Sequence, residues 1–222
     1  MLAIDLISDS IPSIKTSDPA RKVLDWMNEF KVAQLPVVNN EELLGIVQEE
    51  DLLETENAEN PIGNVMLSLP ENTLVYDESH FFDALRLMAD HKLDIIPVIS
   101  ARDGHYCGIL TKSDVLEHAG KFLNVNESGG LIVLEVASNS YALSEIARLC
   151  EGEDAKILSL GVTPTADYGA VRVTIKLNVR ELSRIIATFQ RFEYKIVQVV
   201  FDAEQLDDYR ENYENFLRYL EI

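Results

Sequence analysis

The chain has 222 residues, of which 47% are hydrophobic, so it is long enough and apolar enough for two compact domains. Its 38 acidic residues against 19 Lys and Arg give a formal charge of −19, which excludes a nucleic-acid backbone or an anionic membrane as an expected partner. The start of the chain has no basic leader, and the two cysteines, Cys107 and Cys150, lack metal-ligand spacing. We therefore expect a cytoplasmic protein without a metal site.

The first half of the chain contains a repeat. Residues 13–15 predict a short strand, and an amphipathic helix with Val23, Leu24, Met27 and Phe30 on one face follows. A strand that opens at Pro36, a polar turn, the strand "LLGIV" and a short helix come next. An offset of 61 positions brings back a strand at 74–76, a helix with Ala84, Leu85 and Met88 and a strand that opens at Pro97. Two more residues in the following turn make the offset 63 for the strand "CGIL".

A second unit follows the polar stretch "LNVNESGG", residues 123–130. It has four predicted strands, "LIVLEVA", "ILSLGV", "AVRVTIKL" and "KIVQVV". Helices are predicted at 141–151 and 179–192, which makes the order strand, helix, strand, strand, helix, strand, a ferredoxin-like arrangement. The tail, 203–222, predicts a helix with apolar residues near one face, and we expect that face to pack on its own chain more readily than on a partner subunit.

The residues up to 122 resemble a CBS-domain pair, or Bateman module, with repeats at 1–61 and 62–122. "GILTKSD" carries the most specific part of this resemblance. Residues 130–202 resemble an ACT domain in topology, and the whole order resembles the stand-alone CBS-ACT proteins of the acetoin-utilisation type. The expected fold class is therefore α+β (α/β), with tandem CBS repeats, a ferredoxin-like βαββαβ domain and a C-terminal helix.

Thr111 and Asp114 admit two interpretations. A Thr followed three residues later by Asp forms a helix capping box, in which the hydroxyl accepts a backbone N–H and the carboxylate reaches back. The same pair at a helix start can hold a nucleotide, because free N–H groups favour a phosphate and a carboxylate accepts hydrogen bonds from ribose hydroxyls.

The resemblance implies the second interpretation. It assigns Asp114 to the ribose and Thr111 and Ser113 to the ribose or phosphate, while Lys112 adds a positive charge beside the phosphate path or is simply solvated. The resemblance also implies an adenine pocket, formed by Ile95, Ile96, Pro97 and Ile109.

The first repeat offers a weaker site, at Asp51 with Gln34 and Pro36. Its sequence "GIVQEED" has Gln48 where the hydroxyl residue belongs, and Glu49 and Glu50 would repel a phosphate. We expect this site to be weak, empty, or selective for a ligand that lacks phosphate or carries a metal ion.

The function we expect is ligand sensing by a homodimer that regulates an unidentified protein. The expected ligand is AMP, ADP, ATP, adenosylmethionine or a related adenosyl compound, and no cofactor is required. The alternative is a dimerisation module that docks a partner without a ligand.

The ACT-like turn "ASNSYAL" lacks the glycine typical of ligand-binding members, although Asn139 can adopt a left-handed conformation, so dimerisation is favoured there. The histidines are scattered and no nucleophile or phosphate-loop motif occurs, so we expect no catalytic residues and no enzyme, with an active site in unpatterned residues as the minor alternative.

Overall fold

The structure is a computed structural model that describes the chain except for residues 9, 56, 65–66, 68–72, 167–168 and 202–222. The predicted helix at 203–222 therefore lies outside the described residues. The chain divides into two compact units, of which the first is Met1–Ala119 and the second begins at Gly120. In the part of the chain that is described, no helix is both long enough and apolar enough to cross a membrane.

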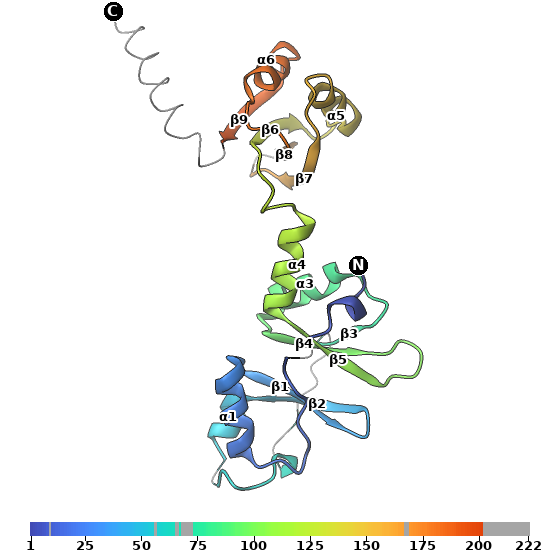
Figure 1. The fold of residues 1–222 in the computed structure, drawn as a ribbon, viewed down its shortest axis with the longest axis vertical. Coiled ribbons are helices and arrows are strands. Elements are labelled where there is room, and N and C mark those ends of the chain that lie inside the picture. Colours follow the sequence, from blue (N-terminus) through green and yellow to red (C-terminus); the bar gives the residue numbers. More distant parts are fainter. Residues whose placement is uncertain (9, 56, 65–66, 68–72, 167–168, 202–222) are drawn as a thin grey trace, which may run out of the picture. The chain divides into compact units, whose positions relative to one another are not determined.

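The first unit contains the two predicted repeats (Figure 1). The first repeat consists of α1 (Ala20–Phe30), β1 (Gln34–Asn39), β2 (Glu42–Gln48) and α2 (Glu49–Leu53). The second consists of β3 (Val75–Tyr76), α3 (Phe81–His91), β4 (Ile95–Ile99), β5 (Tyr106–Thr111) and α4 (Lys112–Phe122). In each, the two longer strands form an antiparallel hairpin, β1 with β2 and β4 with β5. The strand predicted at 13–15 is reduced to one parallel bridge between Ile14 and Val37, where the second repeat has the short strand β3.

Two short 3-10 helices pack on the repeat to which they do not belong in sequence. The first, η1 (Ala3–Leu6), places Ala3 in the core of the second repeat, where its N–H donates to the Ser79 carbonyl at 2.8 Å. The second, η2 (Ile62–Asn64), buries Ile62 in the core of the first repeat. This exchange ties the repeats together in a way that the sequence boundaries at 61 and 62 do not reveal.

The hairpin of the second repeat contributes to both cores of the first unit. Side chains alternate between the two faces of a strand, so neighbouring residues enter different cores. Ile95 and Ile109 are fully buried with the first repeat, whereas Ile96 and Leu110 are fully buried with the second. Burial of both strand faces explains the continuous apolar runs of these segments.

The second unit has the predicted βαββαβ order, formed by β6 (Leu131–Ala137), α5 (Leu143–Glu151), β7 (Ile157–Pro164), β8 (Ala170–Leu177), α6 (Ser183–Arg191) and β9 (Lys195–Val200). Its antiparallel sheet has the order β7-β8-β6-β9, so the first strand lies between the third and the fourth. Both helices lie on one side of this sheet (Figure 1), and Phe189 and Ile146 from them pack on Ile132 and Leu134 of β6. The order is that of a ferredoxin-like fold.

Candidate functional site

A cavity of about 360 Å³ lies in the first unit and is lined by both repeats. The first repeat and the segment before it supply Ser10, Ile11, Phe30, Lys31 and Val32. The second repeat supplies Asp94, Thr111, Lys112, Ser113 and Asp114. Since β5 ends at Thr111 and α4 begins at Lys112, the predicted Thr-x-x-Asp motif sits where the strand turns into the helix.

Thr111 and Asp114 are bonded to each other. The Thr111 hydroxyl donates to Asp114 Oδ2 at 2.5 Å, and the Asp114 backbone N–H donates to Thr111 Oγ1 at 3.1 Å. The second bond is the first half of the capping box that the spacing predicts, but the carboxylate reaches the hydroxyl rather than a backbone N–H. Asp114 lines the cavity, and among the described residues its Oδ1 receives no side-chain hydrogen bond, so this oxygen remains available as an acceptor.

The charges around the cavity balance each other, with Lys31 and Lys112 against Asp94 and Asp114. Lys112 Nζ lies 3.6 Å from Asp94 Oδ1, and this ion pair is largely exposed, so it contributes little to stability. The first turn of α4 also carries N–H groups without an intrahelical acceptor and the positive end of the helix dipole. A cavity without net charge can therefore still accept an anionic group at the α4 end, although the whole chain is acidic.

Lys31 reaches the cavity because helix α1 ends there in a left-handed residue. Its φ of 57° places it at the helix C-cap, with its N–H donating to the Met27 carbonyl. The chain reverses at this point, so Phe30 and Val32, on either side of Lys31, both line the cavity. The equivalent residue of the second repeat, Lys92, ends α3 in the same way with a φ of 54°.

The apolar residues predicted around an adenine lie elsewhere. Ile95, Ile96 and Ile109 are fully buried in the two cores, and Pro97 is buried as well. None of the four lines the cavity, whose apolar surface comes instead from Ile11, Phe30 and Val32. The sequence carries one usable signal for two of these residues, because Phe30 and Val32 flank the end of a predicted amphipathic helix, but it carries none for Ile11.

The residues proposed for the weaker first site are not arranged like Thr111 and Asp114. Asp51 is exposed in the acidic first turn of α2, and the N-cap residue Gln48 makes no side-chain capping bond. Gln34 pairs with Gln48 across the β1–β2 hairpin, and its side-chain oxygen is buried without a hydrogen-bond partner among the described residues. Pro36 is buried in the same hairpin, and the 360 Å³ cavity includes none of the three.

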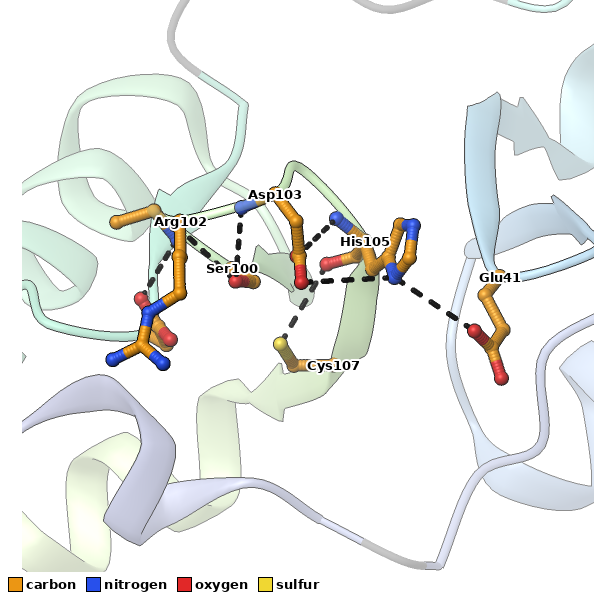
Figure 2. A network of polar contacts seen from close by, with 8 residues as sticks. Glu41, Ser100, Arg102, Asp103, His105 and Cys107 are labelled. Carbon is orange, nitrogen blue, oxygen red and sulfur yellow. Dashed lines mark hydrogen bonds and ion pairs between the residues drawn. The ribbon is translucent and has the colours of Figure 1, made fainter.

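The turns of the two hairpins meet at His105 (Figure 2). Its ring lies between two carboxylates, with Nδ1 at 3.8 Å from Glu41 Oε2 of the first repeat and 3.8 Å from Asp103 Oδ2 of its own turn. The Ser100 side chain and the His105 N–H lower the pKa of Asp103 below its ordinary value. The Tyr106 N–H also donates to the Glu41 carbonyl at 2.8 Å, so this contact joins the repeats through backbone as well as side chains.

The second unit has a cavity of about 420 Å³ beside the start of β9. Glu135, Glu145, Glu193 and Lys195 line it, and the Tyr194 hydroxyl donates to Glu145 at 2.9 Å. Lys195 is paired with Glu135.

The turn after β6 forms without a left-handed residue at Asn139, contrary to the conformation considered from the sequence. In the described part of the chain, no cluster of three or more His, Cys, Asp or Glu side chains could hold a metal ion.

Comparison with known protein families identifies both repeats. The family model described as "CBS domain" matches residues 3–57 and 62–121. An inosine-5'-monophosphate dehydrogenase of Methanocaldococcus jannaschii is 20% identical over 152 residues, which are 68% of this chain and 30% of that protein. The chain spans less than half the length of the curated relatives it matches.

Solved structures with CBS domains are also similar to this chain. A CBS domain pair/ACT domain protein from Thermotoga maritima is 24% identical with a TM-score of 0.49, and the match covers 55% of this chain and 98% of that one. The Arabidopsis thaliana protein CBSX2, in its complex with AMP, is 28% identical with a TM-score of 0.45, and the match covers 54% of this chain and 96% of that one.

Proposed function

Because the chain belongs to the CBS-domain family, we propose that it is a regulatory protein that senses an adenine nucleotide or adenosine derivative through its paired repeats. The observation that carries this proposal is the cavity at the start of α4, where groups suited to the separate parts of a nucleotide converge. Its volume of about 360 Å³ falls in the range of small-molecule sites.

Each part of the ligand has a partner of suitable chemistry. Asp114 Oδ1 accepts from the ribose hydroxyls, and the Ser113 N–H in the first turn of α4 donates to the phosphate, since the Lys112 N–H donates to the Asp94 carbonyl and the Asp114 N–H to Thr111. Lys31 and Lys112 are the cations of the lining, and each has a partner in the protein: Lys31 Nζ donates to Asn28 Oδ1 at 3.0 Å, and Lys112 Nζ lies 3.6 Å from Asp94 Oδ1. The ring of Phe30, with Ile11 and Val32, provides the apolar surface for the base. In this assignment Thr111 positions the carboxylate rather than binding the ligand.

The mechanism of sensing follows from the fact that both repeats contribute residues to the lining of the cavity. A ligand in this cavity contacts Phe30 of the first repeat and Asp114 of the second at the same time. Such a ligand stabilises the relative arrangement of the two repeats in which both residues can reach the ligand. A regulated partner that recognises this arrangement then reads the ligand concentration. This role requires no turnover of the ligand and no cofactor.

The second unit serves as an ACT-like dimerisation domain in this proposal. Its βαββαβ order and its sheet support the assignment, and the exposed strands β7 and β9 offer edges through which two copies can pair. The turn at Asn139 contains no glycine, which disfavours an amino-acid ligand there.

Thermal unfolding with AMP, ADP, ATP and adenosylmethionine tests the sensor. We expect at least one of them to raise the Tm by several degrees at millimolar concentration, and Asp114→Asn to abolish that shift. Asp51→Asn is the matched control, because Asp51 occupies the equivalent position of the first repeat and its loss should leave the shift intact.

The same experiment addresses a docking module that binds no small ligand. The mutual bonds of Thr111 and Asp114 favour this second function, because they satisfy a structural cap without any ligand. A lower Tm for Asp114→Asn, together with no ligand shift in the unmodified protein, would establish the cap and refute the sensor.

A further inference from the structure

The second unit has an apolar groove on the sheet face opposite its helices. We call this the outer face and define it by Leu131, Val133 and Glu135 of β6 with Arg172, Thr174 and Lys176 of β8, which alternate with the buried residues of the same strands. The groove has a volume of about 310 Å³. Its lining is Leu123, Val125, Leu131, Ser159, Leu160, Gly161, Thr174 and Lys176.

One wall of the groove is the segment that precedes the sheet. The Asn124 side chain donates to the Leu158 carbonyl at 2.8 Å, and Lys176 Nζ donates to the Val125 carbonyl at 3.0 Å. These bonds hold Leu123 and Val125 beside the strands, although about half of each side chain is still exposed, at 45% and 56%. Apolar side chains that are held in place but remain half exposed can be covered by a further apolar segment.

The outer face is also cationic, in contrast to the chain as a whole. Lys176 has no ion-pair partner among the described residues, and Arg172 and Lys195 accompany Glu135 on the same face. A segment that fits this groove therefore needs both apolar and acidic residues.

We propose that the C-terminal segment of the same chain, residues 202–222, binds in this groove. Its 21 residues include seven Asp or Glu and two Arg, and its apolar residues recur at helical spacing: Leu206, Tyr209, Tyr213, Phe216, Leu217 and Leu220. The segment thus combines the net negative charge and the apolar stripe that the outer face complements.

The topology favours this segment over one from a second copy. In the sheet register, Val200 at the end of β9 pairs with Leu131, which lines the groove. The described strand that leads to the segment therefore ends about one strand spacing, roughly 4.8 Å, from a residue of the groove. As a helix it would extend about 30 Å, enough to cross four strands, and the short tether gives a high effective concentration.

Paramagnetic broadening of amide signals tests the proposal on the full-length chain. A spin label is attached to Asn212→Cys in a background with Cys107→Ser and Cys150→Ala, and the protein carries ¹⁵N. We expect the Gly161 and Thr174 amides to lose most of their intensity, while Glu151, at the end of α5, retains its signal. The charge reversal Lys176→Glu should restore much of the lost intensity, whereas Lys156→Glu, paired with Glu151 away from the groove, should not.

Isotope mixing identifies the source of the segment. Spin-labelled ¹⁴N protein is mixed with unlabelled ¹⁵N protein, so that only contacts between copies broaden the signals. Because the first sample reports contacts both within and between copies, broadening of the Gly161 and Thr174 amides that persists in this mixture would show that a second copy covers the groove, and no broadening in either sample would show that the segment stays away from it. Either result overturns the proposal. Unshifted α6 signals confirm that each variant folds.

Discussion

At the scale of single residues, the bonds between Thr111 and Asp114 show a structural role for the motif and leave room for the proposed binding role. The hydroxyl both accepts the Asp114 N–H and donates to Oδ2, which holds the carboxylate in place in the lining of the cavity. Only one carboxylate oxygen is used in this way, and the other can serve a ligand. The two interpretations that the spacing left open are therefore compatible, and ligand titration tests the binding role.

Tyr194 supplies a prediction about pH. Burial, and then its hydrogen bond to Glu145, raise its pKa from 10.0 to about 12. The folded state holds the hydroxyl proton of Tyr194 more tightly than the unfolded state does. The stabilisation of the folded state by the protonated tyrosine is therefore complete below pH 10 and is lost as the pH rises towards 12. We expect the Tm difference between the unmodified protein and Tyr194→Phe to shrink across this window, as measured by circular dichroism.

Glu145→Gln is the control for that measurement, since it removes the charge that disfavours the tyrosinate while it keeps a side chain able to accept the hydroxyl proton. The pH dependence assigned to Tyr194 should weaken in this variant. A Tm difference between the unmodified protein and Tyr194→Phe that stays constant across the window would show that the bond to Glu145 does not govern the titration.

At the scale of helices and strands, hydrophobic alternation predicted the second unit with few errors. The strands Leu131–Ala137, Ala170–Leu177 and Lys195–Val200 have the predicted limits, because one face of each is in contact with the helices. The helices begin later than predicted, at Leu143 and Ser183. Periodicity marks the apolar face of a helix but not the residue at which its backbone becomes helical.

The sequence predicted only the polar part of the lining of the candidate cavity. Thr111 to Asp114 follow from a local motif, whereas the apolar lining depends on the face of the β4–β5 hairpin that meets each core. Ile95 and Ile109 turn towards the first repeat and Ile96 towards the second, so the hairpin leaves none of these side chains for the cavity. A pattern of continuous apolar residues cannot distinguish a core from the wall of a pocket.

The left-handed ends of α1 and α3 lead to a prediction at the same scale. Lys92 is exposed and has a φ of 54°, a conformation that is unfavourable by about 1 kcal/mol for a residue with a Cβ. We expect Lys92→Gly to raise the free energy of unfolding by about 1 kcal/mol. Urea unfolding measures this change. Lys92→Ala is the matched control, because it removes the same side chain but keeps the Cβ, and it should leave stability nearly unchanged.

Equal stabilities for Lys92→Gly and Lys92→Ala would mean that the flexibility of glycine in the unfolded chain offsets the relief of strain. An increase for both variants would instead assign the effect to loss of the lysine charge or stem. Lys31 is less suitable for this experiment, since the same substitution there would also change the lining of the candidate cavity.

At the scale of the whole molecule, the two repeats of the first unit form one compact unit rather than two. They exchange η1 and η2, share the β4–β5 hairpin between their cores and meet again at His105. None of these links is visible in a repeat alignment, because each joins residues that the alignment assigns to different copies. The candidate site depends on them, since its lining comes from both repeats.

The formal charge of −19 predicts how the molecule responds to salt. With twice as many acidic as basic residues, the compact state concentrates like charges, and the described ion pairs are mostly exposed and weak. Raising NaCl from about 10 to about 150 mM shortens the screening length from roughly 30 to 8 Å. Repulsion between distant carboxylates should then fall more than the attraction within close pairs, so we expect the Tm to rise by several degrees.

Differential scanning calorimetry at constant pH measures this change, with KCl as a control for specific ion binding. A Tm that falls with either salt would show that ion pairs such as Lys22–Asp18, at 2.7 Å, outweigh the net repulsion.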